Sequence, residues 1–204
     1  MPNLAQFRTD LSSLMQSEHE RPFVCSGSPF SCSVFLVGFN PATRLESSFW
    51  SFWNDSQGFD RSRFINEYER LRTVKGVRLR LNAMVPQFPL GSVLETNICS
   101  EPTKKATDLK SKDRRTNIFR FLLETIRPRI VFLHSNEPIR FFRTLLDNPR
   151  IELPHHALVD ASVLGSQVKV CASEGPLWRK KVPEMAILAG TLSEHAGPAQ
   201  VVSD

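Results

Sequence analysis

Short apolar runs alternate along this chain with longer segments whose apolar residues recur at helical spacing. A short apolar run rich in β-branched residues suits a strand that is buried on both faces of a sheet. Four such runs predict strands, over residues 34–37, 93–99, 130–133 and 168–171. The second of these runs is the most polar.

Segments with apolar residues at positions i, i+3 and i+4 predict amphipathic helices. They span residues 3–16, 49–53, 64–71, 118–126 and 138–146, and a last helix begins near Pro183. Prolines, glycines and serines predict loops over residues 21–33 and 82–92.

Strands that alternate with helices are typical of an α/β domain built around a largely parallel sheet. At 204 residues, the chain is long enough to bury one full core. We therefore predict a single three-layer domain over residues 1–204, with a four-stranded, mostly parallel central sheet and helices on both faces. The small and polar residues 194–204 predict a flexible tail.

The composition is ordinary for a globular protein, with 41% apolar and 23% charged residues. No apolar run approaches the ~20 residues of a membrane span, so we expect a cytoplasmic protein, nuclear in a eukaryote, with no membrane partner. We also expect a monomer. The four cysteines are scattered and predict buried thiols, with a four-cysteine iron–sulfur site as the less favoured alternative.

Basic residues outnumber acidic ones by 26 to 21 and concentrate in two stretches, over residues 61–80 and 104–120. Such stretches suit contact with a phosphate backbone, or they form solvated helix faces. The charge pattern alone leaves both interpretations open.

Several common catalytic motifs are absent from the sequence: a Walker A loop, G-x-G-x-x-G, G-x-S-x-G and H-E-x-x-H. This weighs against a nucleotide hydrolase or a dehydrogenase. The histidines lack the spacing of zinc ligands, so we expect no metal and no cofactor.

An asparagine follows the first predicted strand, at Asn40, and another lies near the end of the second, at Asn97. Open α/β sheets bind ligands at the carboxyl ends of their strands. A side-chain amide offers a donor and an acceptor together, so it can pair with the imide edge of a flipped pyrimidine. The alternative is that each asparagine caps its own turn. The aromatic run 49–53 likewise either packs in the core or supplies a ring that stacks on a planar ligand.

Three segments of the chain resemble motifs of the uracil-DNA glycosylase superfamily, over roughly residues 34–178. The run VFLVGFNPAT, followed by SSFWSFW and GFD, is similar to the first motif, where the mismatch-specific and single-strand-selective branches have G-x-N-P-G. LETNICSEP resembles the segment whose asparagine reads uracil. LLETIRPRIVFLHS resembles the helix and strand before the third strand end.

The resemblance implies a DNA glycosylase that removes uracil or a related base, with DNA or RNA as the partner. Asn40 would position the attacking water, and Asn97 would bind the base edge. Phe49 or Phe52 would stack on the base. Further implied residues are Gly38 and Phe39 at the base, Ser173, Glu174, Gly175 and Pro176 in the second motif and DNA wedge, and Lys104, Lys105, Lys110, Lys112, Arg114 and Arg115 at the phosphates.

The second motif departs from the family pattern. Most branches have a histidine there that stabilises charge on the leaving base, and this chain has Ser173 or a neighbour in its place. His134 is a candidate substitute donor, with a capped structural histidine as the alternative. The departure also motivates a second hypothesis, a nucleic-acid or nucleobase binding module that keeps the fold with weakened chemistry.

Overall fold

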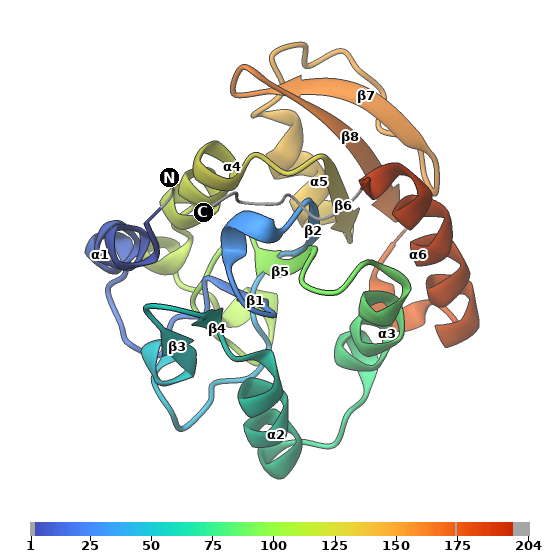
Figure 1. Ribbon diagram of the computed structural model, residues 1–204. Helices are drawn as coiled ribbons and strands as arrows, with labels where there is room; N and C mark the ends of the chain where they lie inside the picture. The colour runs from blue at the N-terminus through green and yellow to red at the C-terminus, as the bar shows by residue number, and fades with distance from the viewer. Residues whose placement is uncertain (1–2, 174, 198–204) are drawn as a thin grey trace.

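The computed structural model describes residues 3–173 and 175–197, and its centre is a six-stranded mixed sheet (Figure 1). The strands lie in the order β1-β5-β2-β6-β8-β7. Their bounds are β1 Phe23–Cys25, β2 Val34–Gly38, β5 Val93–Asn97, β6 Ile130–His134, β7 Leu158–Val163 and β8 Ser166–Ser173. A separate hairpin pairs β3 (Trp53–Asn54) with β4 (Gly58–Phe59).

The four central strands, β5, β2, β6 and β8, run parallel, and the edge strands β1 and β7 are antiparallel to their neighbours. The predicted mostly parallel α/β sheet is therefore confirmed, and the four predicted strands form its parallel centre. The predicted count of four is wrong because the sheet has two more strands at its edges. β1 is only three residues long and lies in a segment rich in turn-forming residues. β7 is half exposed and lacks the apolar run that marks the central strands.

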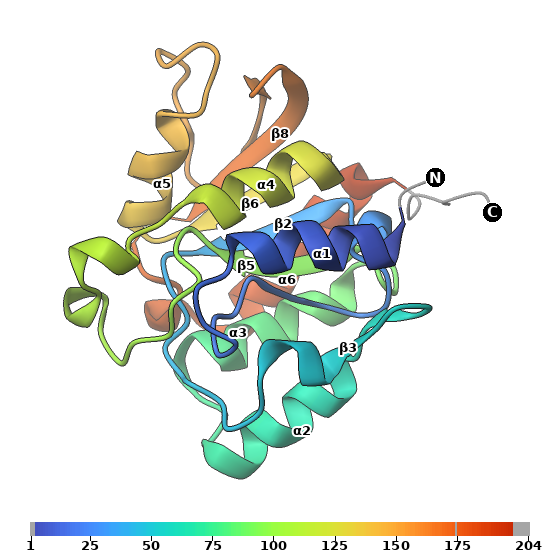
Figure 2. The same ribbon diagram turned by 90° about the vertical axis from the view of Figure 1, so that its left-hand side faces the viewer.

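Helices cover both faces of the sheet (Figure 2). Their bounds are α1 Leu4–Leu14, α2 Arg61–Leu71, α3 Gly76–Met84, α4 Asn117–Ile126, α5 Asn136–Arg143 and α6 Val182–Ala196. α1, α4 and α5 bury apolar side chains with Phe35 and Val37 of β2, on one face. α3 and α6 pack with Val34 and Leu36 on the other face.

Three helix predictions need correction. No helix is predicted over the first half of α3, because arginines alternate with its apolar residues and no helical apolar spacing is apparent. The end of α3, through Met84, lies in the segment 82–92 that is predicted to be a loop. Residues Phe49–Phe52 form a short 3-10 helix. α6 continues through Ala196, so the predicted tail does not begin at residue 194. Residues 198–204 of that tail lie outside the described residues.

The state of the cysteines and the length of the helices can also be read from the fold. The four cysteines are buried and form no disulfide, as predicted. Within the described ranges, no helix has the length and apolar character needed to cross a bilayer.

Candidate functional site

The carboxyl ends of the four parallel strands place Asn97, Gly38, His134 and Ser173 in one row. Gly38 is in register with Asn97, and His134 is in register with Ser173. The pairing of β2 with β6 brings Gly38 and His134 to adjacent positions. Because side chains alternate along a strand, all four positions share the sheet face that α3 and α6 cover.

Gly38 leaves space at the strand end that two neighbouring side chains occupy. A Cβ on Gly38 would lie 2.6 Å from Oδ1 of Asn97, and 2.8 Å from Cε1 and 3.0 Å from Nε2 of His134. No larger residue fits without moving the amide or the imidazole. Glycine is required here for close approach between strands.

A cavity of about 110 Å³ opens at this edge, and Asn40, Asn97 and His134 all line it. Its other polar lining residues are Arg21, Thr43, Tyr68, Arg78, Glu95 and Thr96. Pockets for drug-sized ligands measure roughly 300–1,000 Å³. The cavity therefore suits a single small planar group better than a whole nucleotide.

Asn40 is held in place by the loop that follows β5. Its Nδ2 donates to Oγ1 of Thr103 at 2.7 Å and to the carbonyls of Thr103 and Pro41, each at 3.3 Å. The backbone N–H of Thr103 in turn donates to the Pro41 carbonyl at 2.9 Å. With the amide nitrogen used in this way, Oδ1 of Asn40 remains as an acceptor for a water or a ligand.

His134 is buried and neutral at physiological pH. Burial lowers its pKa to about 4, and the negative charge of Glu95 only partly opposes that effect. Its ring makes no hydrogen bond to any residue that the structure describes, so both nitrogens remain available to a ligand.

Ser135, the next residue, has φ 85°, a backbone conformation that serine rarely adopts. Such strain costs on the order of 1–3 kcal/mol and concentrates at functional sites.

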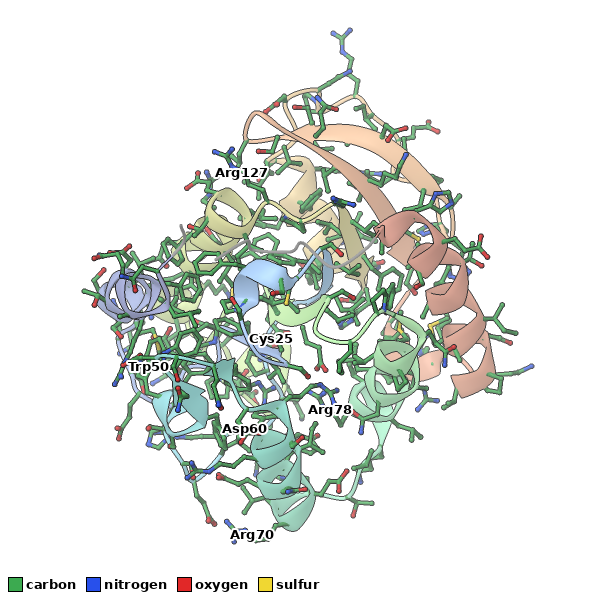
Figure 3. All side chains as sticks on the ribbon, viewed as in Figure 1. Cys25, Trp50, Asp60, Arg70, Arg78 and Arg127 are labelled. Carbon is green, nitrogen blue, oxygen red and sulfur yellow. The ribbon has the colours of Figure 1, made fainter. Side chains whose placement is uncertain are left out.

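A buried carboxylate lies beneath the cavity between two arginines. Glu95 accepts from Nη2 of Arg61 at 2.8 Å and from Nη1 of Arg78 at 2.5 Å. Burial raises the pKa of Glu95, but the charges of Arg78 and Arg61 outweigh it, so the pKa lies below its ordinary value. Figure 3 shows Arg78 in the space between α2 and α3. Arg21 and Arg78 line the cavity with this single carboxylate, so the cavity is net positive.

Phe49 and Phe52 do not line this cavity. Their rings are buried in an aromatic cluster, where Phe49 lies 5.2 Å from Phe23 and Phe52 lies 5.6 Å from Phe64, between ring centroids. The aromatic residue with a hydroxyl at the cavity is Tyr68, on α2. Phe39 points away and lines a separate groove on the molecule.

Of the predicted second motif, residues 173–176, only Ser173 lies in the row of strand ends. Ser173 is fully buried beside His134, and its Oγ has no hydrogen-bond partner among the described residues. Glu174 lies outside the described residues. Gly175 and Pro176 do not line the cavity.

The predicted phosphate-binding residues divide into two groups. Five of them are exposed: Lys104, Lys105, Lys110, Lys112 and Arg114. Arg115 instead pairs with the buried Glu20 and donates to the Leu14 carbonyl at 2.9 Å. Its guanidinium is therefore engaged in contacts within the fold.

Arg21 and Arg78 are site residues that sequence reasoning missed as such. Arg21 lies in a segment predicted to be a loop, and no local pattern distinguishes it. Arg78 belongs to the basic stretch over residues 61–80, and only its contact with Glu95 distinguishes it from the other arginines there.

No protein-family model and no curated protein sequence matches this chain. Among the residues that the structure describes, no three histidine, cysteine or acidic side chains are grouped so that they could hold a metal ion.

Gly38→Ala should displace Asn97 and His134 while the fold persists, because the atoms that the new methyl meets are side-chain ends. We expect the imidazole NMR signals of His134 to shift. Gly190→Ala, where a Cβ meets nothing within 4 Å, is the matched control and should leave them unchanged. An unaltered His134 spectrum in Gly38→Ala would contradict the close approach described here.

The neutral state of His134 predicts a specific pH dependence of stability. As pH falls from about 6.5 to about 4, the unfolded chain takes up a proton at this histidine and the folded chain does not. The free energy of unfolding should therefore decline across this window, by up to about 3 kcal/mol. His134→Gln should lose that component in urea titrations, whereas replacing the exposed His195 by Gln should retain it. Equal pH profiles for all three proteins would refute the shift.

Proposed function

We propose that this chain is a DNA glycosylase that hydrolyses the N-glycosidic bond of uracil or a closely related base. The observation that carries the proposal is the convergence of Asn40, Asn97 and His134 on one small cavity. These residues lie far apart in the sequence, and each follows or ends a different parallel strand.

In this proposal, Asn97 reads the edge of the flipped base. Its amide supplies one donor and one acceptor, which match an imide. The neutral imidazole of His134 lies beside it and adds a hydrogen bond to a base oxygen. A base that is mispaired or already in a single strand costs less to extrude, which adds selectivity.

Asn40 positions the attacking water through Oδ1. The bond between C1′ of the sugar and the base nitrogen breaks, and its electron pair leaves with the base. The water oxygen bonds to C1′, and the proton that the water loses balances the charge of the departed base. The protein contributes a fixed acceptor for the water and a positive environment for the leaving group.

In this proposal, the lysines of the loop that follows β5 contact the phosphates of the DNA strand. Lys104 and Lys105 are exposed and follow Thr103, the residue that bonds to Asn40. A backbone held by these lysines would pass beside the cavity, where an extruded base enters.

The sheet and its covering helices agree with the fold that the resemblance to uracil-DNA glycosylases implies. The resemblance implies a mostly parallel sheet with helices on both faces, and the four central strands have that form. The histidine that the family has in its second motif is Ser173 here. His134 lies next to Ser173 on the adjacent strand and takes over the role of donor.

Asn40→Ala should lower the rate of uracil release at least about 100-fold, because the water loses its fixed acceptor. Oligonucleotides with U·G, U·A and single-stranded uracil are the substrates, and free uracil is measured at enzyme excess. Asn66→Ala, an exposed position on α2, is the control and should keep full activity. Failure of the unaltered protein to release uracil from all three substrates rejects uracil glycosylase activity.

A nucleic-acid binding module without the chemistry is the second candidate, motivated by the serine at the histidine position. DNA binding without base release would favour it. Under either function, replacing Lys104 and Lys105 together by alanine should reduce the slope of log K against log salt by about 1–2. Lys169→Ala is the control, because Asp160 already neutralises that charge. An unchanged slope in the double variant would remove these lysines from the interface.

A further inference from the structure

We infer that Arg21 forms a subsite for the negatively charged form of the base at one end of the cavity. The inference rests on the proposed function and deepens it, because a base that leaves with the bond electrons is an anion. Arg21 then adds a positive charge to the neutral hydrogen-bond donor that His134 supplies.

Arg21 has donors and charge that its neighbours do not use. A guanidinium carries several N–H donors, and the structure gives Arg21 one side-chain hydrogen bond, from Nη1 to the Thr43 carbonyl at 3.3 Å. No described carboxylate forms an ion pair with it. Arg61 and Arg78 differ in this respect, because both bind Glu95.

The position of Arg21 is fixed before any ligand arrives. Its backbone N–H donates to the Ser100 carbonyl at 2.9 Å, and its guanidinium lies 5.5 Å from the centroid of the Phe64 ring. The bond to Thr43 ties it to the turn that carries Asn40. Burial, and then the charge of Arg78, lower its pKa to about 10, so the group remains cationic at pH 7.

The other groups at the cavity cannot supply this charge. His134 is neutral, and Asn40 and Asn97 carry none. The guanidinium of Arg78 is committed to Glu95 through its Nη1. When the bond to C1′ breaks, negative charge spreads from the ring nitrogen to the base oxygens. Arg21 is the unpaired cation on the cavity wall, among the described residues, that can face it.

The first experiment measures ligand binding by the full chain at pH 7. Barbiturate has the uracil ring but is an anion at this pH, and uracil is its neutral counterpart. The protein should bind barbiturate more tightly than uracil, and Arg21→Met should abolish the preference while Arg21→Lys retains part of it. Arg63→Met is the matched control, because Arg63 also lies over a ring, that of Phe52, but outside the cavity.

The second experiment measures release of uracil and of 5-fluorouracil from single-stranded oligonucleotides. Fluorine withdraws electrons, so 5-fluorouracil leaves more readily and needs less help. Arg21→Met should slow uracil release about 10-fold more than 5-fluorouracil release. A purely structural role would slow both equally. Arg21→Gln replaces Arg21→Met if the latter does not fold.

The outcomes separate this inference from the proposed function. Arg21-dependent preference for barbiturate without any base release supports the subsite and rejects the glycosylase. Base release with no preference for barbiturate overturns the subsite and leaves the glycosylase standing. Inorganic phosphate serves as the third probe. Arg21-dependent binding of phosphate with no preference for barbiturate means that the site takes a backbone phosphate, and it also overturns the inference.

Discussion

The buried carboxylate of Glu95 connects three elements that together build the cavity. It extends from β5 and binds Arg61 at the start of α2 and Arg78 on α3. Removing a charge from water is costly, and here two guanidiniums compensate a single carboxylate. Loss of one arginine would leave Glu95 with a single partner, and loss of Glu95 would leave the buried Arg78 without its counter-ion. The positions of Tyr68 on α2 and of Arg78 itself depend on this contact, and so does the net charge of the cavity.

A second constraint acts at the strand ends. The parallel register brings Asn97, Gly38 and His134 together, and the missing side chain of Gly38 lets the amide and the imidazole approach. The cavity thus combines residues from a loop before β1, from two helices and from neighbouring strands. Arg78 enters the cavity from α3 and Arg21 from the loop before β1, whereas Glu95, Asn97 and His134 come from strands. A small polar group would meet both at once.

The parts of this arrangement that are local in sequence could be predicted. The apolar runs of β2 and β6 are continuous because both faces of those strands are covered. Asn40, just after β2, and Asn97, at the end of β5, lie at the cavity. The edge strands could not be predicted in this way. β1 is too short to show a pattern, and β7 is half exposed.

The contribution of side chains that act across the fold was harder to predict. Helical spacing shows that Phe49 and Phe52 share a face, but it does not say what that face packs against, and both belong to the core. Arg21 and Arg78 gain their roles only from tertiary contacts. His134 was recognised as a candidate because it ends a strand, and its neutral state follows from burial, which no spacing reveals.

The hydrogen bonds between Asn40 and Thr103 have a consequence for thermodynamic coupling. The loop that holds the amide also carries Lys104 and Lys105. Under the proposed function, a strand of DNA that orders this loop would also restrict Asn40. By linkage, occupancy of the cavity and occupancy of the loop must then change each other's affinity by the same factor. Under the proposed function, affinity for the base and affinity for the strand could not be adjusted independently, and a substitution at Thr103 would change both together.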